Sequence, residues 1–250
     1  MAAGKNKLLK HARVYAGGVD VSGDARTFGV LENGYEAVDM TGWSNSCKTH
    51  LANKRRTTGA RGFSGFMNDA SGGWLERFQN PANTRAFALV LGGGGEPEFG
   101  DPAYILPSLQ PTAPVGLDGE AVVVTCDFLP EAENAGSFDN PWGILLYPKT
   151  SISATTNGSS LDNSASSAAG YAATVHVFGT SSGDFSFLIQ QSTSGAWAGE
   201  ETTLGTFSID GSSISSAFLS GSGSVARYIR FRAVRTAGTI SVACCFSRNY

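Results

Sequence analysis

The sequence has 250 residues, of which 41% are hydrophobic and only 16% are charged, and its formal net charge is -3. So small a net charge provides no overall attraction to nucleic acid or to an anionic membrane surface. The 32 glycines, together with abundant serine, indicate many turns and argue against a mainly helical protein.

The N-terminal segment is basic and polar, and residues 1–12 are predicted to form a flexible arm that orders on assembly. No apolar core of a signal peptide follows it, and no stretch reaches the roughly 20 apolar residues of a membrane span. We therefore expect no membrane partner and synthesis in the cytoplasm.

Short strands are predicted along the first half of the chain, where apolar and polar residues alternate between turn signals. They cover residues 14–15, 19–21, 35–40, 57–69, 84–91, 119–131 and 140–148. Residues 102–116 are interrupted by prolines and are predicted to form an edge or crossing segment. One short helix is predicted around Trp74, Leu75 and Phe78, ending before Pro81.

A change of composition marks the predicted domain boundary. Residues 148–170 are almost wholly small and polar, which favours a linker or a long exposed excursion. The predicted organisation is an arm at 1–12, a β domain at 13–147, the linker at 148–170 and a β-sandwich at 171–250. The fold class is therefore all-β with a minor helical part.

The last 23 residues carry the clearest alternation. Ile229, Phe231 and Ala233 share one face of an extended strand, and Arg230 and Arg232 lie on the other. A second alternating run, from residue 240 to residue 246, follows a short glycine-containing turn. The pattern predicts a β-hairpin with a core face and a polar, basic face.

No catalytic, cofactor or metal site is predicted. Gly92–Gly95 lacks the following helix and lysine of a phosphate loop. The histidines are dispersed, and His176 is predicted to face outward from its strand. The carboxylate pairs lie in loops without a cleft. The cysteines lack zinc spacing and are predicted to be free thiols, although a disulfide from Cys126 to Cys244 or Cys245 is left open.

Basic side chains are the candidate assembly contacts. The run between residues 48 and 61 lacks the interleaved aromatic residues that stack on bases, so it is predicted to be exposed loop charge or an ion-paired subunit contact. The full set is Lys48, Lys54, Arg55, Arg56, Arg61, Arg230 and Arg232. Arg230 and Arg232 are expected to meet acidic residues of the same or an adjacent subunit rather than DNA. Trp197, in a Ser/Gly-rich segment, leaves a carbohydrate-binding alternative open.

Several segments resemble tail tube proteins of tailed bacteriophages. These segments are VYAGGVDVSGDARTFGV, YEAVDMTGWS and KTHLANKRRTTGARGFSGFMND. The second half, including VARYIRFRAVRTAGTISVACCFSR, is similar to a C-terminal β-sandwich module of phage structural proteins. The resemblance implies a tail-tube-like β-barrel or sandwich with one short helix, followed by a jelly-roll-like sandwich.

The resemblance also implies a structural role in the virion rather than an enzyme. The expected function is a tail tube subunit that forms homo-oligomeric rings, trimeric or hexameric, through β-edge contacts and binds other virion proteins. Specific nucleic-acid recognition is not expected. The alternatives are a capsid decoration, collar or head–tail connection protein, or a carbohydrate-binding virion module.

Overall fold

The computed structural model describes residues 11–39, 50–68, 84–109, 114–130, 140–179 and 183–249, and these form antiparallel β-sheets. The all-β class predicted from the sequence is confirmed. The first half forms β1 (Ala12–Ala16), β2 (Val19–Asp20), β3 (Ala25–Thr27), β4 (Val30–Asp39), β5 (His50–Phe66), β6 (Thr84–Leu91), β7 (Pro102–Leu109), β8 (Val115–Asp118) and β9 (Ala121–Pro130). The second half forms β10 (Trp142–Ile152), β11 (Thr156–Asn157), β12 (Leu161–Asp162), β13 (Tyr171–Phe178), β14 (Asp184–Ser192), β15 (Thr202–Thr206), β16 (Ser215–Gly221), β17 (Tyr228–Ala237) and β18 (Ile240–Arg248).

The strands form two sheets. Within the described residues, one sheet has the order β16-β13-β18-β10-β7-β6-β1-β2 and branches through β9 to β3, β4, β5 and β8. The other sheet has the order β11-β17-β14-β15, with β12 also paired to β17. The described part of the first sheet does not close on itself, so the predicted barrel stays a prediction. The predicted helix and residues 1–10 lie outside the described residues.

The sequence correctly indicated a tight turn near the N-terminus. β1 and β2 pair across Gly17 and Gly18, whose φ angles of 60° and 83° require the left-handed region that glycine adopts most easily. Ala12, assigned to the flexible arm, instead begins β1 and pairs with Leu91 of β6.

The proline-containing strand β7 is an interior strand, and its prediction as an edge or crossing segment was wrong. It pairs with β6 on one side, with β10 near Tyr104 and with β9 from Ser108. Pro107 lies between these last two pairings. The N–H of Ile105, two residues earlier, donates to the carbonyl oxygen of Pro141 and therefore points away from β6. Residues two apart in a strand point their N–H groups to the same side, so the N–H that Pro107 lacks would point away from β6 too. It would face the stretch between the pairings with β10 and with β9.

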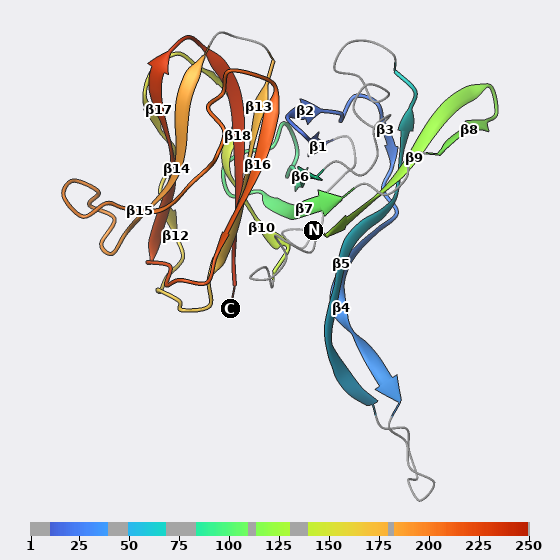
Figure 1. Ribbon diagram of the computed structural model, residues 1–250, viewed down its shortest axis with the longest axis horizontal. Helices are drawn as coiled ribbons and strands as arrows, with labels where there is room; N and C mark the ends of the chain where they lie inside the picture. The colour runs from blue at the N-terminus through green and yellow to red at the C-terminus, as the bar shows by residue number, and fades with distance from the viewer. Residues whose placement is uncertain are drawn as a thin grey trace, which may run out of the picture.

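The two C-terminal strands exist as predicted, but they do not form a hairpin. β17 pairs with β14, β11 and β12, whereas β18 pairs with β10 and β13 in the other sheet. The chain crosses between sheets beside Gly238, which has a φ of 73°. The two sheets pack face to face as a β-sandwich (Figure 1).

The sandwich core contains the predicted face of β17. Ile229, Phe231 and Ala233 are fully buried, and they pack against residues such as Val242 and Cys244 of β18. The opposite face of β18 is buried as well. Ala243 and Cys245 belong to the other core, called the first core because it includes Phe63 and Phe128 from the first half of the chain. Strand β18 therefore separates two cores and contributes to both.

The segment at 148–170 is more structured than a linker. It contains the end of β10, and β11 and β12, which pair with β17 at the margin of the sandwich. The first core also includes Ala172 and Phe178 from beyond this segment. The division into two separate domains at 148–170 stays a prediction.

Two hairpins extend from the body. In Figure 1, β4 and β5 run downward, away from the sandwich, and β8 with the start of β9 runs out to the right. β9 pairs with β5 only between Ala60 and Phe66, so β5 from His50 to Gly59 pairs with β4 alone in the described structure. The amide of Gly59 donates to the Tyr104 hydroxyl at 3.1 Å, which fixes the base of this ribbon to β7.

Candidate interaction surfaces

The basic run between residues 48 and 61 lies largely on β5 rather than in an exposed loop. Lys54 and Arg55 fall within a register shift, because Arg56 pairs with Tyr35 while Ala52 pairs with Ala37. Residues 53–55 of β5 therefore lie opposite residue 36 of β4 alone. Such an excess of residues in one strand of a pair is a β-bulge. Lys48 lies outside the described residues.

Arg61 has a partner within its own chain. Its Nε atom lies 2.9 Å from a carboxylate oxygen of Glu32 on β4, and both side chains are partly exposed. The bond to Glu32 raises the pKa of Arg61 further. Such an exposed pair supports the pairing of β4 with β5 but contributes little to stability.

Arg230 lies on the outer face of the sandwich, far from β5 in the fold. Its Nε donates to the side-chain oxygen of Gln190 at 3.0 Å, and its guanidinium carbon lies 4.2 Å from the centre of the Trp197 ring. Partial burial lowers the pKa of Arg230. Its direct contacts are an amide and an aromatic ring. The carboxylate of Glu201, in the same chain, is close enough to act on the pKa of Arg230 in the opposite direction, although no ion pair between the two is among the described contacts.

The loop that carries Trp197 is held by Glu200. That carboxylate accepts hydrogen bonds from the Ser194 hydroxyl at 2.6 Å and the Ser192 hydroxyl at 3.0 Å, and these bonds lower the pKa of Glu200, with Ser194 contributing most. Trp197 has a φ of 59° and is half-buried beneath Arg230. Because Arg230 covers one face of its ring, that face of Trp197 is not available to stack on a sugar.

Arg232 lies two residues further along the same outer face, beside Asn157 of β11. Its Nε atom is buried and has no hydrogen-bond partner within the described residues. The structure therefore keeps Arg230 and Arg232 on one sheet and the 54–61 group on another. Arg230 and Arg232 alternate with apolar residues, whereas Lys54, Arg55 and Arg56 are consecutive, and neither pattern indicates that the two groups lie on different sheets.

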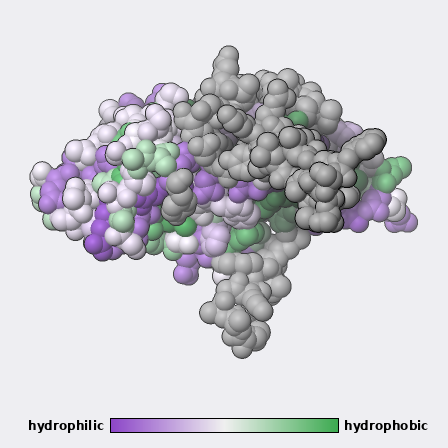
Figure 2. All heavy atoms as spheres, turned by 90° about the horizontal axis from the view of Figure 1, so that it is seen from below, coloured by the Kyte–Doolittle hydropathy of each residue, from purple (hydrophilic) through white to green (hydrophobic). Residues whose placement is uncertain are grey.

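The strongest exposed apolar surface was missed by sequence reasoning. Exposed apolar residues lie on β8, on β9 and at the end of β5, and their exposed fractions are Leu117 78%, Val115 56%, Phe66 45%, Met67 40% and Val122 38%. Val115, Leu117 and Val122 share one face of the sheet, whereas Phe66 pairs with Val123 and lies on the other face. In Figure 2 hydrophobic residues are visible at the right-hand end of the molecule, where Figure 1 places this hairpin. The alternation in β9 predicted a strand with one apolar face. It did not indicate that this face is buried at Val124 and Cys126 but exposed at Val122.

A second feature missed from the sequence is a cluster of paired charges. Arg13 of β1 bonds to Glu96, and Lys149 of β10 lies 2.8 Å from a carboxylate oxygen of Asp20 on β2. These four side chains line a hollow of about 420 Å³ together with Tyr15. Burial raises the pKa of Tyr15, so its hydroxyl stays protonated. Because the charges are paired, the hollow has no excess charge to attract an ionic ligand.

His176 is fully buried, so its predicted outward orientation was wrong. Its strand, β13, has cores on both faces, and the imidazole lies 5.7 Å from the Tyr15 ring and 6.2 Å from the Phe178 ring between ring centres. Neither ring nitrogen has a hydrogen-bond partner within the described structure. Burial lowers the pKa of His176 to about 3, although nearby Asp20 acts in the opposite direction.

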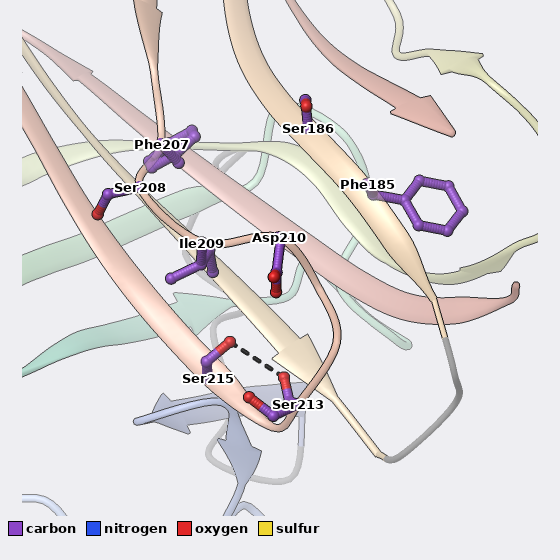
Figure 3. A pocket seen from close by; sticks show the side chains of 8 residues that line it. All are labelled: Phe185, Ser186, Phe207, Ser208, Ile209, Asp210, Ser213 and Ser215. Carbon is purple, nitrogen blue, oxygen red and sulfur yellow. Dashed lines mark hydrogen bonds between the residues drawn. The ribbon is translucent and has the colours of Figure 1, made fainter. Parts of the chain in front are cut away.

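The depression in Figure 3 lies at the rim of the sandwich. It is lined by Phe185, Ser186, Phe207, Ser208, Ile209, Asp210, Ser213 and Ser215. Asp210 accepts bonds from the amide and hydroxyl of Ser212, at 2.9 and 2.7 Å, and these lower its pKa. A carboxyl kept ionised in this way is a poor general acid.

The described cysteines lie in the protein interior. Cys126, Cys244 and Cys245 are buried free thiols, so the disulfide that the sequence left open is not formed. Burial raises the pKa of Cys245 to about 12. Across the described ranges, no group of three His, Cys, Asp or Glu side chains is arranged to hold a metal ion. None of the described helical segments is long and apolar enough to span a membrane.

Comparisons with known proteins give little similarity. No protein-family model matches the chain, and no curated protein matches it. Among solved structures, the chain is similar to the Dit protein of phage SPP1, described as a paradigm of the hub adsorption apparatus in phages that infect Gram-positive hosts. The identity is 11%, the match covers 95% of this chain and 99% of Dit, and the TM-score is 0.27.

A second match is the insecticidal delta-endotoxin Cry8Ea1 from Bacillus thuringiensis. It is 9% identical, the match covers 96% of this chain and 52% of the toxin chain, and the TM-score is 0.26. Both TM-scores are so low that neither likeness carries an argument about what this chain does.

Proposed function

We propose that the chain is a structural subunit of a tailed-phage virion, and specifically a tail tube subunit that assembles with copies of itself. The observation that carries the proposal is the ribbon formed by β4 and β5, which extends from the body (Figure 1). A two-stranded ribbon is marginally stable alone in water. A chain that builds one of this length needs a neighbour against which to place it.

The rest of the described surface supports an assembly role. β8 is an edge strand with all four residues exposed, and edge strands offer unpaired backbone groups to another chain. The chain also resembles tail tube proteins in the segments quoted above. The proposal covers the neighbouring roles of decoration, collar and head–tail connection protein as alternatives within the virion.

Electron microscopy of the purified protein tests this function, together with mass spectrometry of particles of a phage that encodes the chain. We expect closed rings or tubes from the purified protein and the chain itself in the particles, at many copies each. Absence of the chain from purified particles would contradict the virion role. Presence in particles at many copies, without self-assembly in solution, would favour a decoration protein over a tube subunit.

A further inference from the structure

Two arginines lie next to each other on the outer face of the smaller sheet of the sandwich. Arg230 and Arg232 are two residues apart in β17, so their side chains share one face, with their Cα atoms about 7 Å apart. Burial lowers the pKa of Arg230 most, and the positive charge of Arg232 lowers it further. The two guanidinium groups are therefore close enough to repel each other, and an anion bound between them would offset this repulsion.

Arg230 is held in place by its own chain. Its Nε donates to the side-chain oxygen of Gln190 at 3.0 Å, and its guanidinium carbon lies 4.2 Å from the centre of the Trp197 ring. Gln190 is buried and lies opposite Arg230 on β14, which runs beside β17 (Figure 1). These contacts use Nε and one flat face of the guanidinium. The two terminal nitrogens have no hydrogen bond among the described residues, so a ligand can bind to donors that are already ordered.

Arg232 has no comparable partner. It lies between Leu188 of β14 and Asn157 of β11. Its Nε atom is buried, and none of the residues that the structure describes gives Arg232 a hydrogen bond or an ion pair. A buried donor without a partner costs free energy, and such groups are rare in folded proteins. The surroundings of Arg232 therefore favour a partner from outside the described chain.

The acidic groups of this face leave a small positive excess at the arginine pair. Asp162 accepts two bonds from Arg227 and is neutralised there. Glu200 accepts hydrogen bonds from serine hydroxyls of its own loop. Glu201 acts on the pKa of Arg230 against the larger effect of burial, but no ion pair joins the two among the described residues. Two arginines and this one carboxylate leave a single positive charge, which one further carboxylate would balance.

A single carboxylate suits this face better than a run of phosphates. Guanidinium groups bind both kinds of oxyanion through paired N–H bonds. Duplex DNA, however, carries one negative charge for about every 1.7 Å of its length. A DNA backbone laid along this face would bring several charges toward Asp162, Glu200 and Glu201. An acidic side chain brings one charge, and the residues that flank it in a peptide need not be charged.

We infer that Arg230 and Arg232 together bind a carboxylate on an acidic peptide segment of a partner protein. Arg230, packed on Trp197, is the fixed half of the site, and the carboxylate supplies the ionic partner that Arg232 lacks among the described residues. The inference goes beyond the proposed function and does not require the chain to assemble with itself.

Fluorescence polarisation with the full chain and a labelled peptide tests the site at low ionic strength. The probe is a short peptide with two glutamates among glycine and serine, and the same peptide with glutamines is its control. We expect only the glutamate peptide to bind, and we expect added salt to weaken the binding because the contact is an ion pair near the surface. Failure of the glutamate peptide to bind with a Kd below about 1 mM overturns the inference.

Substitutions in β17 locate the binding. Arg232→Met removes one half of the site, and we expect it to weaken binding about tenfold or more, as loss of a charged hydrogen bond does. Arg235→Met is the matched control, because it removes the same charge from the same strand. Arg235 is exposed, and its Nε donates to the carbonyl oxygen of Gly238 instead. This variant should bind as the parent does. Equal weakening in both variants would show that binding follows net charge alone and would overturn the inference.

A short DNA duplex is the competing ligand, and circular dichroism confirms that each variant is folded. We expect the duplex to bind less tightly than the glutamate peptide. Tighter binding of the duplex, lost in Arg232→Met, would assign the arginine pair to nucleic acid and overturn the inference. None of these outcomes bears on the virion role, which is decided by the composition of the particles.

Discussion

At the scale of single residues, His176 is a side chain whose surroundings strongly disfavour its charged form. The imidazole is packed among Tyr15, Phe178 and the backbone of β13, and neither ring nitrogen is hydrogen-bonded in the described structure. The charged groups nearest to this packing are Asp20 and Lys149, which are paired with each other. Burial therefore dominates, and the folded protein holds His176 neutral.

This burial predicts an acid-sensitive stability. The folded-state pKa of about 3 lies below the usual value of 6.5. Above pH 6.5, His176 is therefore neutral in both the folded and the unfolded chain and does not lower the free energy of unfolding. As the pH falls from 6.5 toward 3, the unfolded chain binds one more proton than the folded chain, and the free energy of unfolding falls by about 1.4 kcal/mol per pH unit.

His176→Leu should remove this component. Between pH 6.5 and pH 5 we expect the parent to lose about 2 kcal/mol more than the variant, measured from urea midpoints at each pH. Parallel pH profiles for the two proteins would contradict a buried neutral His176.

Arg230 provides a second prediction at this scale. Arg230→Met removes the stacking on Trp197 and the bond to Gln190, and we expect it to lower the free energy of unfolding by about 1 kcal/mol. Arg232→Met is the matched control on the same face, because the described contacts of Arg232 include neither an aromatic ring nor a side-chain amide. It should lower the free energy of unfolding by less than Arg230→Met does. Urea denaturation measures both, and equal losses would show that the Trp197 contact contributes nothing.

The sequence could place the apolar face of β17 but not the burial of His176. Ile229, Phe231 and Ala233 alternate with polar residues, and period-2 alternation is sufficient to identify a strand with one buried face. β13 reads YAATVHVF, in which a single histidine interrupts small and apolar residues. A strand buried on both faces lacks the alternation that would show which way His176 points.

At the scale of elements, the pairing of β10 with β18 depends on a glycine. A Cβ atom added at Gly143 would lie 2.1 Å from the carbonyl oxygen of Phe246, which is backbone and cannot move aside. We expect Gly143→Ala to force the strands apart and to cost about 1–3 kcal/mol.

Gly34→Ala in β4 is the control for this substitution, because nothing lies within 4 Å of its added Cβ. Thermal unfolding followed by circular dichroism compares the two variants. Gly34→Ala should leave the midpoint nearly unchanged. A Gly143→Ala midpoint equal to that of the parent would mean that β10 and β18 are not packed as closely as described.

The predicted C-terminal hairpin, which does not form, shows the limit of local sequence signals. Thr236–Gly238 has turn chemistry, and both flanking strands were predicted correctly. A short turn, however, serves equally well to fold a strand onto its neighbour and to carry it across to the facing sheet about 10 Å away. The distinguishing signal was present in β18, where Ala243 and Cys245 make the supposed polar face apolar.

At the scale of the whole molecule, the sequence predicted the all-β class and many strands but not how the halves join. The composition of 148–170 reflects its exposure, and an exposed segment need not separate two folding units. The continuous sheet depends on contacts between β7 and β10 and between β10 and β18, which are distant in sequence. Local periodicity does not specify such pairings.

The shared strand β18 predicts that the described body unfolds as one cooperative unit. Cys244 packs in the sandwich core and Cys245 in the first core, on opposite faces of the same strand. Two independent domains would unfold in two transitions, and a change in one core would shift only its own. A single unit would show one transition, because losing either face of β18 removes support from the other core.

Cys244→Ser and Cys245→Ser are therefore a matched pair, since each buries one hydroxyl in one core. By differential scanning calorimetry we expect a single transition for the parent, with calorimetric and van't Hoff enthalpies in agreement. Each variant should lower that same midpoint by about 2–8 °C, because a buried polar substitution costs about 1–3 kcal/mol. If each variant shifted a different one of two transitions, the two cores would be independent, and the boundary at 148–170 would divide true folding domains.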